Sequence, residues 1–317
     1  MAATPVISLV IATYNRGPSI ARTLDSVLAQ THRPDEILVV DDCSTDGTGS
    51  WVQEHYPTVR VARTPSNLRT SGARNYGASH ATGDVLAFLD HDDELLPHAL
   101  ETLLANLKRF PKARASFADH TYVNHASGVR YSNHHFAQSA FARLHRVAAR
   151  ERDGEVRLYG KEMYYALLRG NLLQQPWAIY RETFQTLGGF AAEVRYCEDW
   201  DLYLRVAHAV PLVLTDRVIS NHVIEGENLH LAAGQAEMHM KVIRRQLAAQ
   251  RWRDPRAATV LRRRLAQYYK SAGDQLRQSS LRQAWKHYAA SFFTWPFDHV
   301  VAARTLLWLG PLCLGKP

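Results

Sequence analysis

The sequence predicts an α/β fold whose sheet is mostly parallel and flanked by helices. Three apolar runs of strand length support this prediction, residues 6–12, 36–40 and 85–89, and each ends abruptly in polar residues. Helix-forming segments follow the first two runs, which is the alternation typical of a parallel sheet. In such sheets ligands bind beyond the carboxyl ends of the strands. The three polar tips are therefore expected to gather at one edge and to form a site.

The first run is followed directly by a predicted helix. Pro18 suits the first position of that helix, where an N–H would have no partner in any case. Apolar residues then recur at helical spacing along residues 20–28. The polar tip between the strand and the helix comprises Thr13, Tyr14, Asn15 and Arg16.

The second run ends in two carboxylates, Asp41 and Asp42. A turn and helix-start segment, residues 44–48, comes next. Two interpretations remain open for the pair. Both residues can serve the following helix as caps, or one of them can bind a ligand while the other is structural.

The third run ends in Asp90, His91, Asp92 and Asp93. Alternation along a strand predicts that Asp90 and Asp92 point to the same side and that His91 points away. Two anions held so close repel each other unless a positive charge lies between them. A divalent cation with oxygen ligands would meet that need and would also bind a phosphate. The alternative is a solvated acidic turn.

A second acidic cluster begins a predicted helix at Glu198 and Asp199. Acidic residues complement the dipole at a helix N-terminus, so the cluster can be structural, chemical or both. Just upstream, residues 181–187 are predicted as a short helix that ends at Gly188 and Gly189, a typical C-cap.

The charge is unevenly distributed along the chain. The net charge is +8, yet residues 241–317 hold 15 lysines and arginines against three acids, so residues 1–240 carry −4. The basic segment is also aromatic and is predicted to form helices near residues 238–247, 257–271, 281–293 and 298–309. Two interpretations are equally supported: an anionic membrane surface that binds the tail, and a helical cap whose basic face is solvated.

Composition excludes several classes of protein. The longest apolar stretch is shorter than the roughly 20 residues of a membrane-spanning helix, and no charged, apolar leader is expected at the N-terminus. Three widely spaced cysteines argue against a disulfide framework or a zinc site, so a cytoplasmic protein is expected. No glycine-rich dinucleotide motif follows the first strand, and no nucleic-acid-binding module accompanies the basic charge.

Taken together, the motifs resemble a family 2 glycosyltransferase with the GT-A fold. The resemblance covers about residues 5–230, and its strength lies in the order of the motifs. The nucleotide-sugar half is carried by residues 11–16 (IATYNR), 40–48 (VDDCSTDGT), 72–77 (GARNYG) and 83–93 (GDVLAFLDHDD), and the acceptor half by 188–190 (GGF) and 197–201 (CEDWD).

This resemblance implies a catalytic domain and a function. Residues 1–235 would be the GT-A domain, with the nucleotide-sugar part in about 1–115 and the acceptor part in about 116–235, followed by a basic helical tail over 236–317. The enzyme would move a sugar from a nucleoside diphosphate sugar, UDP-linked, to a carbohydrate or lipid-linked glycan with inversion, in bacterial surface polysaccharide or lipopolysaccharide synthesis. A nucleotidyltransferase and a non-catalytic sugar- or membrane-binding relative are the alternatives.

The resemblance also implies roles on the donor side. Asp42 would accept the imide N–H of uracil, which adenine lacks. Arg74 would touch phosphate, ribose or the acidic loop, and Asp90 with Asp92 would hold Mn²⁺ or Mg²⁺. The nucleotide-binding residues would be Thr13, Tyr14, Asn15, Arg16, Asp42, Arg74, Asp90 and His91.

On the acceptor side the resemblance makes Asp199 the base and lets Glu198 set the pKa of Asp199. Trp177 and Trp200 are the candidate acceptor-binding residues, although core packing is the alternative for Trp177. The family often has a further metal-ligating histidine. Here Glu225 stands at that position and His222 lies three residues earlier, so the third ligand is left open.

Overall fold

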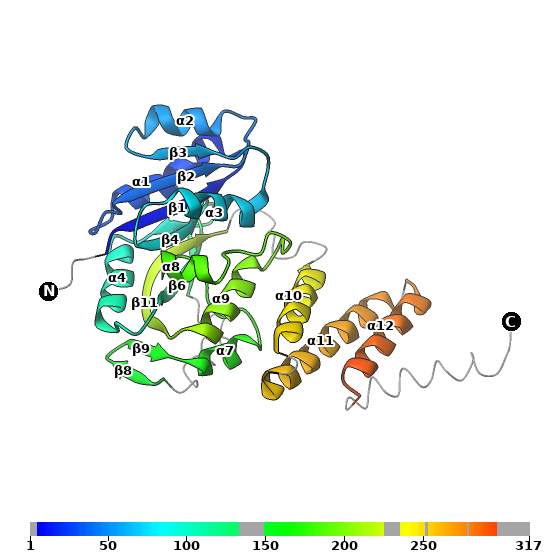
Figure 1. Ribbon diagram of the computed structural model, residues 1–317. Coiled ribbons are helices and arrows are strands. Elements are labelled where there is room, and N and C mark those ends of the chain that lie inside the picture. The colour runs from blue at the N-terminus through cyan, green and yellow to red at the C-terminus, as the bar shows by residue number, and fades with distance from the viewer. Residues whose placement is uncertain (1–4, 133–148, 225–234, 251–252, 278, 297–317) are drawn as a thin grey trace, which may run out of the picture. The chain divides into compact units, whose positions relative to one another are not determined.

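The computed structural model describes residues 5–132, 149–224, 235–250, 253–277 and 279–296 (Figure 1). The chain divides into two compact units, residues 1–229 and residues 230–317, which are described separately below. The helix predicted at residues 298–309 lies outside the described residues.

The first unit is built on one sheet with the strand order β3-β2-β1-β4-β10-β6-β11-β9-β8, in which β5 also pairs with β11 and β7 with β6. The strands are β1 (Ile7–Thr13), β2 (Glu36–Asp41), β3 (Arg60–Arg63), β4 (Val85–Asp90), β5 (Glu94–Leu95), β6 (Ala115–Asn124), β7 (Val129–Ser132), β8 (Glu151–Asp153), β9 (Val156–Tyr159), β10 (Trp177–Tyr180) and β11 (Leu212–Val223).

The helices of this unit include a short 3-10 turn, η1, before the first α-helix. They are η1 (Gly17–Ile20), α1 (Ala21–Leu28), α2 (Thr48–His55), α3 (Arg69–His80), α4 (Ala99–Arg109), α7 (Lys161–Leu167), α8 (Arg181–Thr186) and α9 (Glu198–Ala209).

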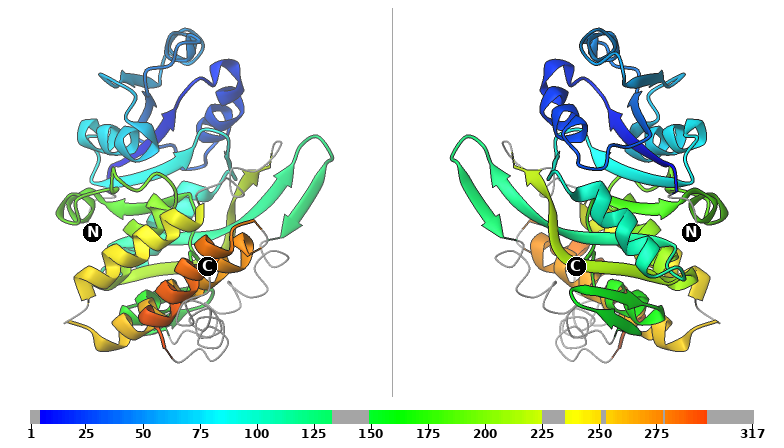
Figure 2. Two further views of the ribbon diagram at one scale, coloured as in Figure 1. Left: turned by 90° about the vertical axis from the view of Figure 1, so that its right-hand side faces the viewer. Right: turned by 90° about the vertical axis from the view of Figure 1, so that its left-hand side faces the viewer.

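The sheet is mixed, which corrects the expectation of a mostly parallel one. Strands β3, β2, β1 and β4 are parallel and lie side by side at one end of the sheet (Figure 1). Strand β10 runs antiparallel between β4 and β6, and β9 runs antiparallel to β11. Helical crossovers build the parallel end, whereas hairpins such as β6–β7 and β8–β9 reverse the chain in the other half (Figure 2).

The parallel strands are buried on both faces, as their unbroken apolar runs predict. On one face Leu9 and Ile11 join a core that includes Leu24 of α1 and Leu103 of α4. On the other face α3 packs directly on β1 and β2. A Cβ at Gly77 would lie 2.5 Å from Cγ1 of Val10 and 2.8 Å from Cγ2 of Val40, so only glycine permits this close approach.

An aromatic cluster fills the sheet face beneath α8 and α9. The ring centroids of Trp177 and Phe117 are 5.2 Å apart in a stacked pair, and those of Phe88 and Phe190 are 5.1 Å apart edge to face. Tyr203 of α9 packs edge to face against Trp177 at 5.2 Å. The cluster therefore joins the strands of both halves of the unit to the helix that carries the second acidic cluster.

The predicted C-cap at the double glycine is confirmed. Helix α8 ends at Thr186, and both Gly188 and Gly189 have left-handed backbone, with φ of 78° and 64°. Their N–H groups donate to the carbonyl oxygens of Gln185 and Phe184. This turn redirects the chain toward the start of α9.

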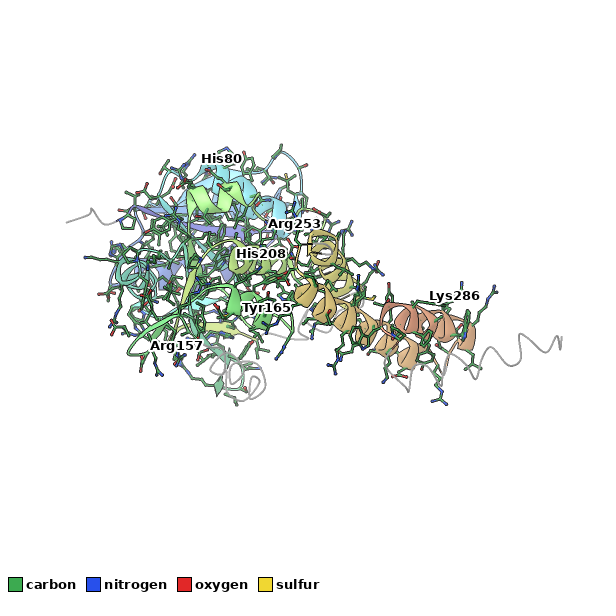
Figure 3. The ribbon with its side chains drawn as sticks, turned by 60° about the horizontal axis from the view of Figure 1, so that its bottom comes forward. His80, Arg157, Tyr165, His208, Arg253 and Lys286 are labelled. Carbon is green, nitrogen blue, oxygen red and sulfur yellow. The ribbon has the colours of Figure 1, made fainter. Side chains whose placement is uncertain are left out.

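The second unit contains three described helices, α10 (Gln235–Gln250), α11 (Pro255–Leu276) and α12 (Leu281–Thr294). Asp254 caps α11 by accepting from Ala257 N at 3.0 Å. A Cβ at Gly273 would lie 2.8 Å from the Tyr288 ring, so α11 and α12 are in close contact. Exposed basic side chains such as Arg253 and Lys286 cover this unit (Figure 3). Among the described residues, no helix is long and apolar enough to span a membrane.

Candidate active site

The three polar tips meet at one edge of the sheet, as predicted. Strand register places Thr13 beside Asp41 and Ala12 beside Asp90. The chain leaves β1, β2 and β4 at the same level, so their tips share the carboxyl edge. The position of this site is thus a direct consequence of the parallel pairing.

The first tip is tied to the turn that follows the second strand. Asn15 adopts left-handed backbone with φ of 52°, its N–H donates to Ser44 Oγ at 2.9 Å, and its Oδ1 accepts from Thr45 N at 2.8 Å. The Arg16 N–H donates to Thr48 Oγ1 at 2.9 Å. These contacts join the tips of β1 and β2 into one rigid structure.

Two other residues of the first tip remain available to a ligand in different ways. The side chain of Tyr14 is 46% exposed, so its ring is open to the edge. Thr13 is buried, and its hydroxyl has no hydrogen-bond partner within the described part of the chain.

Asp41 is a structural residue. Its Oδ1 accepts from Ser44 N at 2.8 Å and its Oδ2 from Arg63 at 2.6 Å, and the side chain is buried. It does not cap α2, because the N-cap of that helix is Gly47.

Asp42 is also buried, but only one of its carboxylate oxygens accepts hydrogen bonds from the described residues. Oδ1 accepts from Thr64 Oγ1 at 2.9 Å and from Leu68 N at 2.8 Å. No hydrogen bond to Oδ2 occurs among the described residues. The carboxylate is held firmly on one side and has acceptor capacity on the other.

The acidic loop differs from its prediction in one respect. Strand β4 ends at Asp90, so the alternation does not extend to Asp92, which lies in the following turn with its side chain 48% exposed. Asp90 forms an ion pair with Arg74. A protein cation therefore already balances Asp90, and of the three partners expected for Arg74 the structure shows the acidic loop.

His91 faces the backbone of β1, as the alternation predicted. Its Nδ1 is 3.3 Å from Ala12 O and its Nε2 is 3.8 Å from Asp92 Oδ2. Burial lowers the pKa of His91, so the ring is neutral near pH 7. A nucleotide contact by this residue stays a prediction.

Arg74 links the two halves of the unit. The guanidinium is buried, forms the ion pair with Asp90, and donates to Glu198 Oε1 at 2.7 Å. It also lies 5.3 Å from the ring centroid of Phe190. One buried cation thus connects the end of β4 to the start of α9.

Helix α3 binds the segment before α9 at two further points. Ser71 Oγ donates to Val194 O at 3.1 Å. Asn75 donates to Phe190 O and accepts from Phe190 N, both at 2.8 Å. Residues 71, 74 and 75 share one helical face because their spacings are three and four residues. That face holds residues 190–198 against the donor half.

The carboxyl groups at the start of α9 have raised pKa values. Burial raises the pKa of Glu198 to about 7, with the charges of Asp199 and Asp90 adding to the effect and Arg74 opposing it. Burial also raises the pKa of Asp199, against hydrogen bonds from Trp200 N and Asn171. A carboxylate with a raised pKa is a better proton acceptor near neutral pH.

Asp201 does not share this environment. It is fully buried, and its Oδ2 accepts from Arg205 Nε at 2.9 Å. Arg205 in turn donates to the carbonyl oxygens of Leu187 and Gly189. Asp201 therefore stabilises the turn after α8 and cannot meet an acceptor.

The prediction that Trp177 and Trp200 bind an acceptor is wrong for this structure. Both side chains are fully buried, so neither indole has a face open to a sugar. Trp177 packs in the aromatic cluster, and Trp200 Nε1 donates to Leu167 O at 2.8 Å. Packing of the sheet against α7 and α9 explains both residues.

His222 lies close to the acidic loop, yet both of its nitrogens have partners. Nε2 is 2.6 Å from Gln175 O, and Nδ1 is 3.4 Å from Asp93 Oδ2. Burial lowers the pKa of His222, and burial with the charges of Asp90 and Asp92 raises that of Asp93. The lowered pKa of His222 and the raised pKa of Asp93 each favour the neutral form of the group. The other candidate third ligand, Glu225, lies outside the described residues.

The acidic edge fits a divalent cation that is bound partly by these carboxylates and partly by a substrate phosphate. Within the described residues, no group of three or more His, Cys, Asp or Glu side chains is arranged to hold a metal. Asp92 is half exposed, and Asp90 has a second oxygen beyond the one paired with Arg74. Mg²⁺ commonly uses one or two carboxylates together with substrate phosphates, so these two residues match that kind of site.

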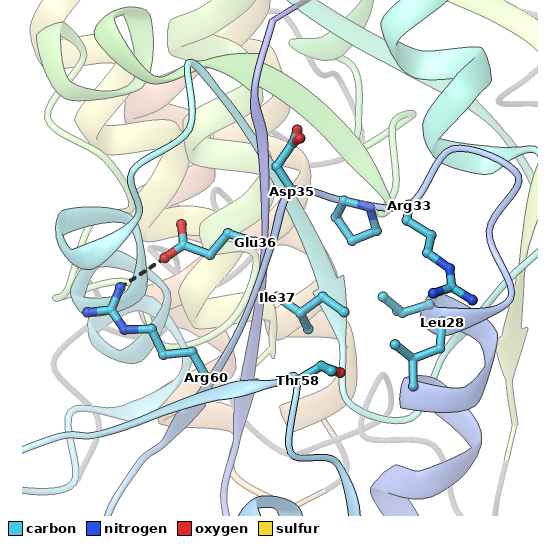
Figure 4. Close-up of a pocket in the computed structure, with 9 residues that line it drawn as sticks. Leu28, Arg33, Asp35, Glu36, Ile37, Thr58 and Arg60 are labelled. Carbon is cyan, nitrogen blue, oxygen red and sulfur yellow. Dashed lines mark hydrogen bonds and ion pairs between the residues drawn. The ribbon is translucent and has the colours of Figure 1, made fainter.

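A pocket of about 300 Å³ lies elsewhere, at the amino end of β2 (Figure 4). Arg33, Asp35, Glu36 and Arg60 line it, and Glu36 is paired with Arg60 at 2.9 Å. Because the acidic tips lie at the opposite end of the same strands, this pocket is separate from the candidate site.

Two site residues were not found from the sequence. Asn171, which contacts Asp199, follows a short helix in a segment without a motif. Asp93 was noted only as part of the acidic run, and its contact with His222 spans 129 residues. Asn75 did stand within the GARNYG motif, but its contact with Phe190 required the tertiary structure.

The model of glycosyl transferase family 2 matches residues 8–164. The chain therefore belongs to that family through these residues, and the resemblance seen in its motifs is confirmed.

Curated relatives are consistent with this assignment. The chain is 42% identical over 101 residues to an uncharacterized glycosyltransferase of Nostoc sp., covering 31% of each. It is 27% identical over 202 residues to one of Haemophilus influenzae, covering 63% of this chain and 62% of the relative. It is 39% identical over 101 residues to the succinoglycan biosynthesis protein ExoO of Rhizobium meliloti, covering 32% and 29%. The matches span less than two thirds of these relatives' own length.

Solved structures confirm the GT-A fold. Residues 1–349 of Staphylococcus aureus TarS in complex with UDP-GlcNAc have a TM-score of 0.63 at 20% identity, covering 90% of this chain and 79% of that TarS chain. The mannosyltransferase PcManGT of Pyrobaculum calidifontis, in complex with GDP-Man and Mn²⁺, has a TM-score of 0.60 at 20% identity, covering 100% and 82%.

We predict that Arg74→Met destabilises the first unit by about 3–5 kcal/mol at pH 8, because it leaves the buried Glu198 and the partly exposed Asp90 without their cation. The loss should shrink at pH 5, since Asp90 and Glu198 can then take up protons and no longer need a cation. Urea unfolding at both pH values measures this difference. The control is Arg109→Met, whose ion pair with Asp153 is about half exposed and should contribute about 1 kcal/mol or less. Equal effects of the two substitutions would contradict the central role of Arg74.

Proposed function

We propose that this chain transfers a sugar from a nucleoside diphosphate sugar to a hydroxyl acceptor with inversion at the anomeric carbon. The observation that carries the proposal is the double contact of Arg74. It joins Asp90, at the end of a donor-side strand, to Glu198, which adjoins the candidate base Asp199. A site that must hold a sugar donor and deprotonate an acceptor needs its donor-side carboxylate and its base at a constant separation.

The nucleotide is proposed to bind across the tips of β1 and β2. The unused Oδ2 of Asp42 suits the imide N–H of a uracil base, and the exposed ring of Tyr14 lies on the neighbouring tip. The structure of TarS with UDP-GlcNAc supports a uridine nucleotide. Because PcManGT is in complex with GDP-Man, GDP is the nucleotide to compare with UDP.

Asp92 and Asp90 are proposed to hold the divalent cation, Mn²⁺ or Mg²⁺. When bound, such a cation would neutralise the diphosphate that leaves. Asp92 is the more available of the two, because Asp90 also pairs with Arg74.

The reaction assigns one task to each half of the site. The bond between the anomeric carbon and the diphosphate oxygen breaks, and a bond from the acceptor oxygen forms on the opposite face of the sugar. The acceptor's proton passes to Asp199, whose raised pKa suits that role. Glu198 adds negative charge beside Asp199 and is itself held by Arg74.

The proposed setting is the synthesis of a surface polysaccharide or lipopolysaccharide. The likeness to ExoO, a succinoglycan biosynthesis protein, supports this setting. We propose residues 1–235 as the catalytic domain and residues 236–317 as a basic helical tail with a separate partner.

A calorimetric series tests the nucleotide site. We expect UDP to bind more tightly than ADP, whose base lacks the imide N–H, and Mn²⁺ to strengthen UDP binding relative to EDTA; GDP is measured alongside. Asp42→Asn should remove the preference for UDP, because the asparagine NH₂ group would face the uracil N–H. Two donors that face each other should cost about 1.5–3 kcal/mol of binding free energy. Asp92→Ala should remove the effect of Mn²⁺ without changing the order of the bases. Equal affinities for the three nucleotides in the wild type would show that Asp42 does not read the base.

Asp199→Asn tests the chemistry. The substitution keeps the shape and removes the proton acceptor, so turnover should fall by about 10²–10⁴. UDP affinity should be retained, because the nucleotide contacts lie on other loops. Glu198→Gln is the matched comparison and should reduce turnover less. Release of nucleoside diphosphate, measured in a donor screen with a sugar acceptor, gives the rates, and normal turnover by Asp199→Asn would rule out this base.

The second unit is proposed to bind an anionic membrane surface. Arg244, Arg263, Arg282 and Lys286 are exposed on its described helices, and Arg253 is exposed just before α11. Large apolar side chains are exposed as well, with Phe293 at 82% and Leu281 at 52%. Basic charge beside exposed apolar residues favours an interface of lipid and water.

We expect the full chain to co-sediment with phosphatidylglycerol vesicles at low salt and to dissociate as salt rises. The triple variant Arg282→Gln, Lys286→Gln and Phe293→Ser should bind more weakly, since each basic residue near such a surface contributes about 1 kcal/mol. Arg33→Gln with Arg217→Gln, two exposed sites on the first unit, serves as the control. A wild-type chain that ignores these vesicles at low salt would leave the second unit as a helical cap.

A further inference from the structure

The candidate base has a second neighbour that the proposed chemistry has not yet used. Asn171 lies between α7 and β10, and its Nδ2 donates to Asp199 Oδ2 at 2.8 Å. The other carboxylate oxygen, Oδ1, accepts from Trp200 N at 2.7 Å. Each oxygen therefore has one donor, which determines the plane of the carboxylate. Since each oxygen can accept more than one hydrogen bond, acceptor capacity remains for a substrate hydroxyl.

The other end of the same amide is not satisfied. Asn171 Oδ1 is buried and has no hydrogen-bond partner among the described residues. An unpaired buried carbonyl is unfavourable, and a leucine of similar shape would avoid it. The amide at this position is therefore explained by what its NH₂ group does, which is to donate to Asp199.

Asp199 lies in a crowded field of charge. Burial raises its pKa, Asp90 adds to that rise, and the hydrogen bonds from Trp200 N and Asn171 and the charge of Arg74 lower it. The titratable or charged groups that interact with Asp199 from the surrounding elements are Arg74, Asp90, Cys197, Glu198, Tyr203 and His222. Asn171 is the neutral side-chain donor that contacts it directly.

We propose that Asn171 is the positioning residue of the base: its amide orients the Asp199 carboxylate toward the acceptor hydroxyl. The proposal rests on the proposed function, in which Asp199 accepts the proton. Asn171 itself touches neither the donor nor the proton that is transferred.

The test compares Asn171→Leu, which removes the amide at similar volume, with the wild type. Turnover should fall by about 10- to 100-fold. Without its donor the carboxylate binds a proton more readily, so the acid limb of the pH–rate profile should move up by about one pH unit. UDP affinity should stay unchanged. The matched control is Asn106→Leu, because Asn106 is also a buried amide but donates to Ser116 Oγ at 3.3 Å.

A second readout does not depend on turnover. Carboxyl titration of Asp199 by ¹³C NMR should show a higher pKa in Asn171→Leu and the wild-type value in Asn106→Leu. Asn171→Ala provides a smaller side chain if the leucine variant does not fold. An unchanged Asp199 titration and an unchanged acid limb would overturn the proposal, even if turnover fell. A wild type without transfer would overturn the proposed function, whereas the titration would still decide the role of Asn171.

Discussion

The site depends on one buried guanidinium. Arg74 lies on a helix that packs so closely on β1 and β2 that Gly77 has no room for a side chain. From that position it pairs with Asp90 at the end of β4 and with Glu198 at the start of α9. A buried charge is stable only when it is paired and hydrogen-bonded. The geometry that satisfies Arg74 is therefore also the geometry that holds the end of β4 and the start of α9 together.

The carboxylates around this cation have different proton affinities. Burial raises the pKa of Asp90, but the charge and hydrogen bond of Arg74, together with His91 and His222, oppose it, and the pKa is lowered overall. Burial dominates for Glu198 and Asp199, and their pKa values are raised. A separation of this kind lets one carboxylate stay ionised for a cation while another takes up a proton. Because Arg74 contacts both Asp90 and Glu198, contact with this cation does not by itself separate the acids, and the balance between burial and the surrounding charges decides each pKa.

The start of α9 is held by packing as much as by charge. The aromatic cluster around Trp177 joins β4, β6 and β10 to α9. Ser71 and Asn75 then hold the segment before α9 through backbone contacts. Backbone contacts of this kind limit how far Asp199 can move relative to the donor edge. A misplacement of about 1 Å can cost a catalytic group roughly 10²-fold in rate, so these contacts bear on catalysis.

The sequence by itself determined the parallel donor half, the shared edge of its three polar tips and the helix that begins at Glu198. These features are encoded locally, because apolar runs, turns and helix-start residues follow one another along the chain. Tertiary structure decided the rest. The antiparallel half, the burial of Trp177 and Trp200, and the pairing of Arg74 with Glu198 across 124 residues all depend on contacts between distant segments. A side chain's partner in space leaves no periodic trace in the sequence, so the second carboxylate of Arg74 and the amide of Asn171 became visible only in the folded chain.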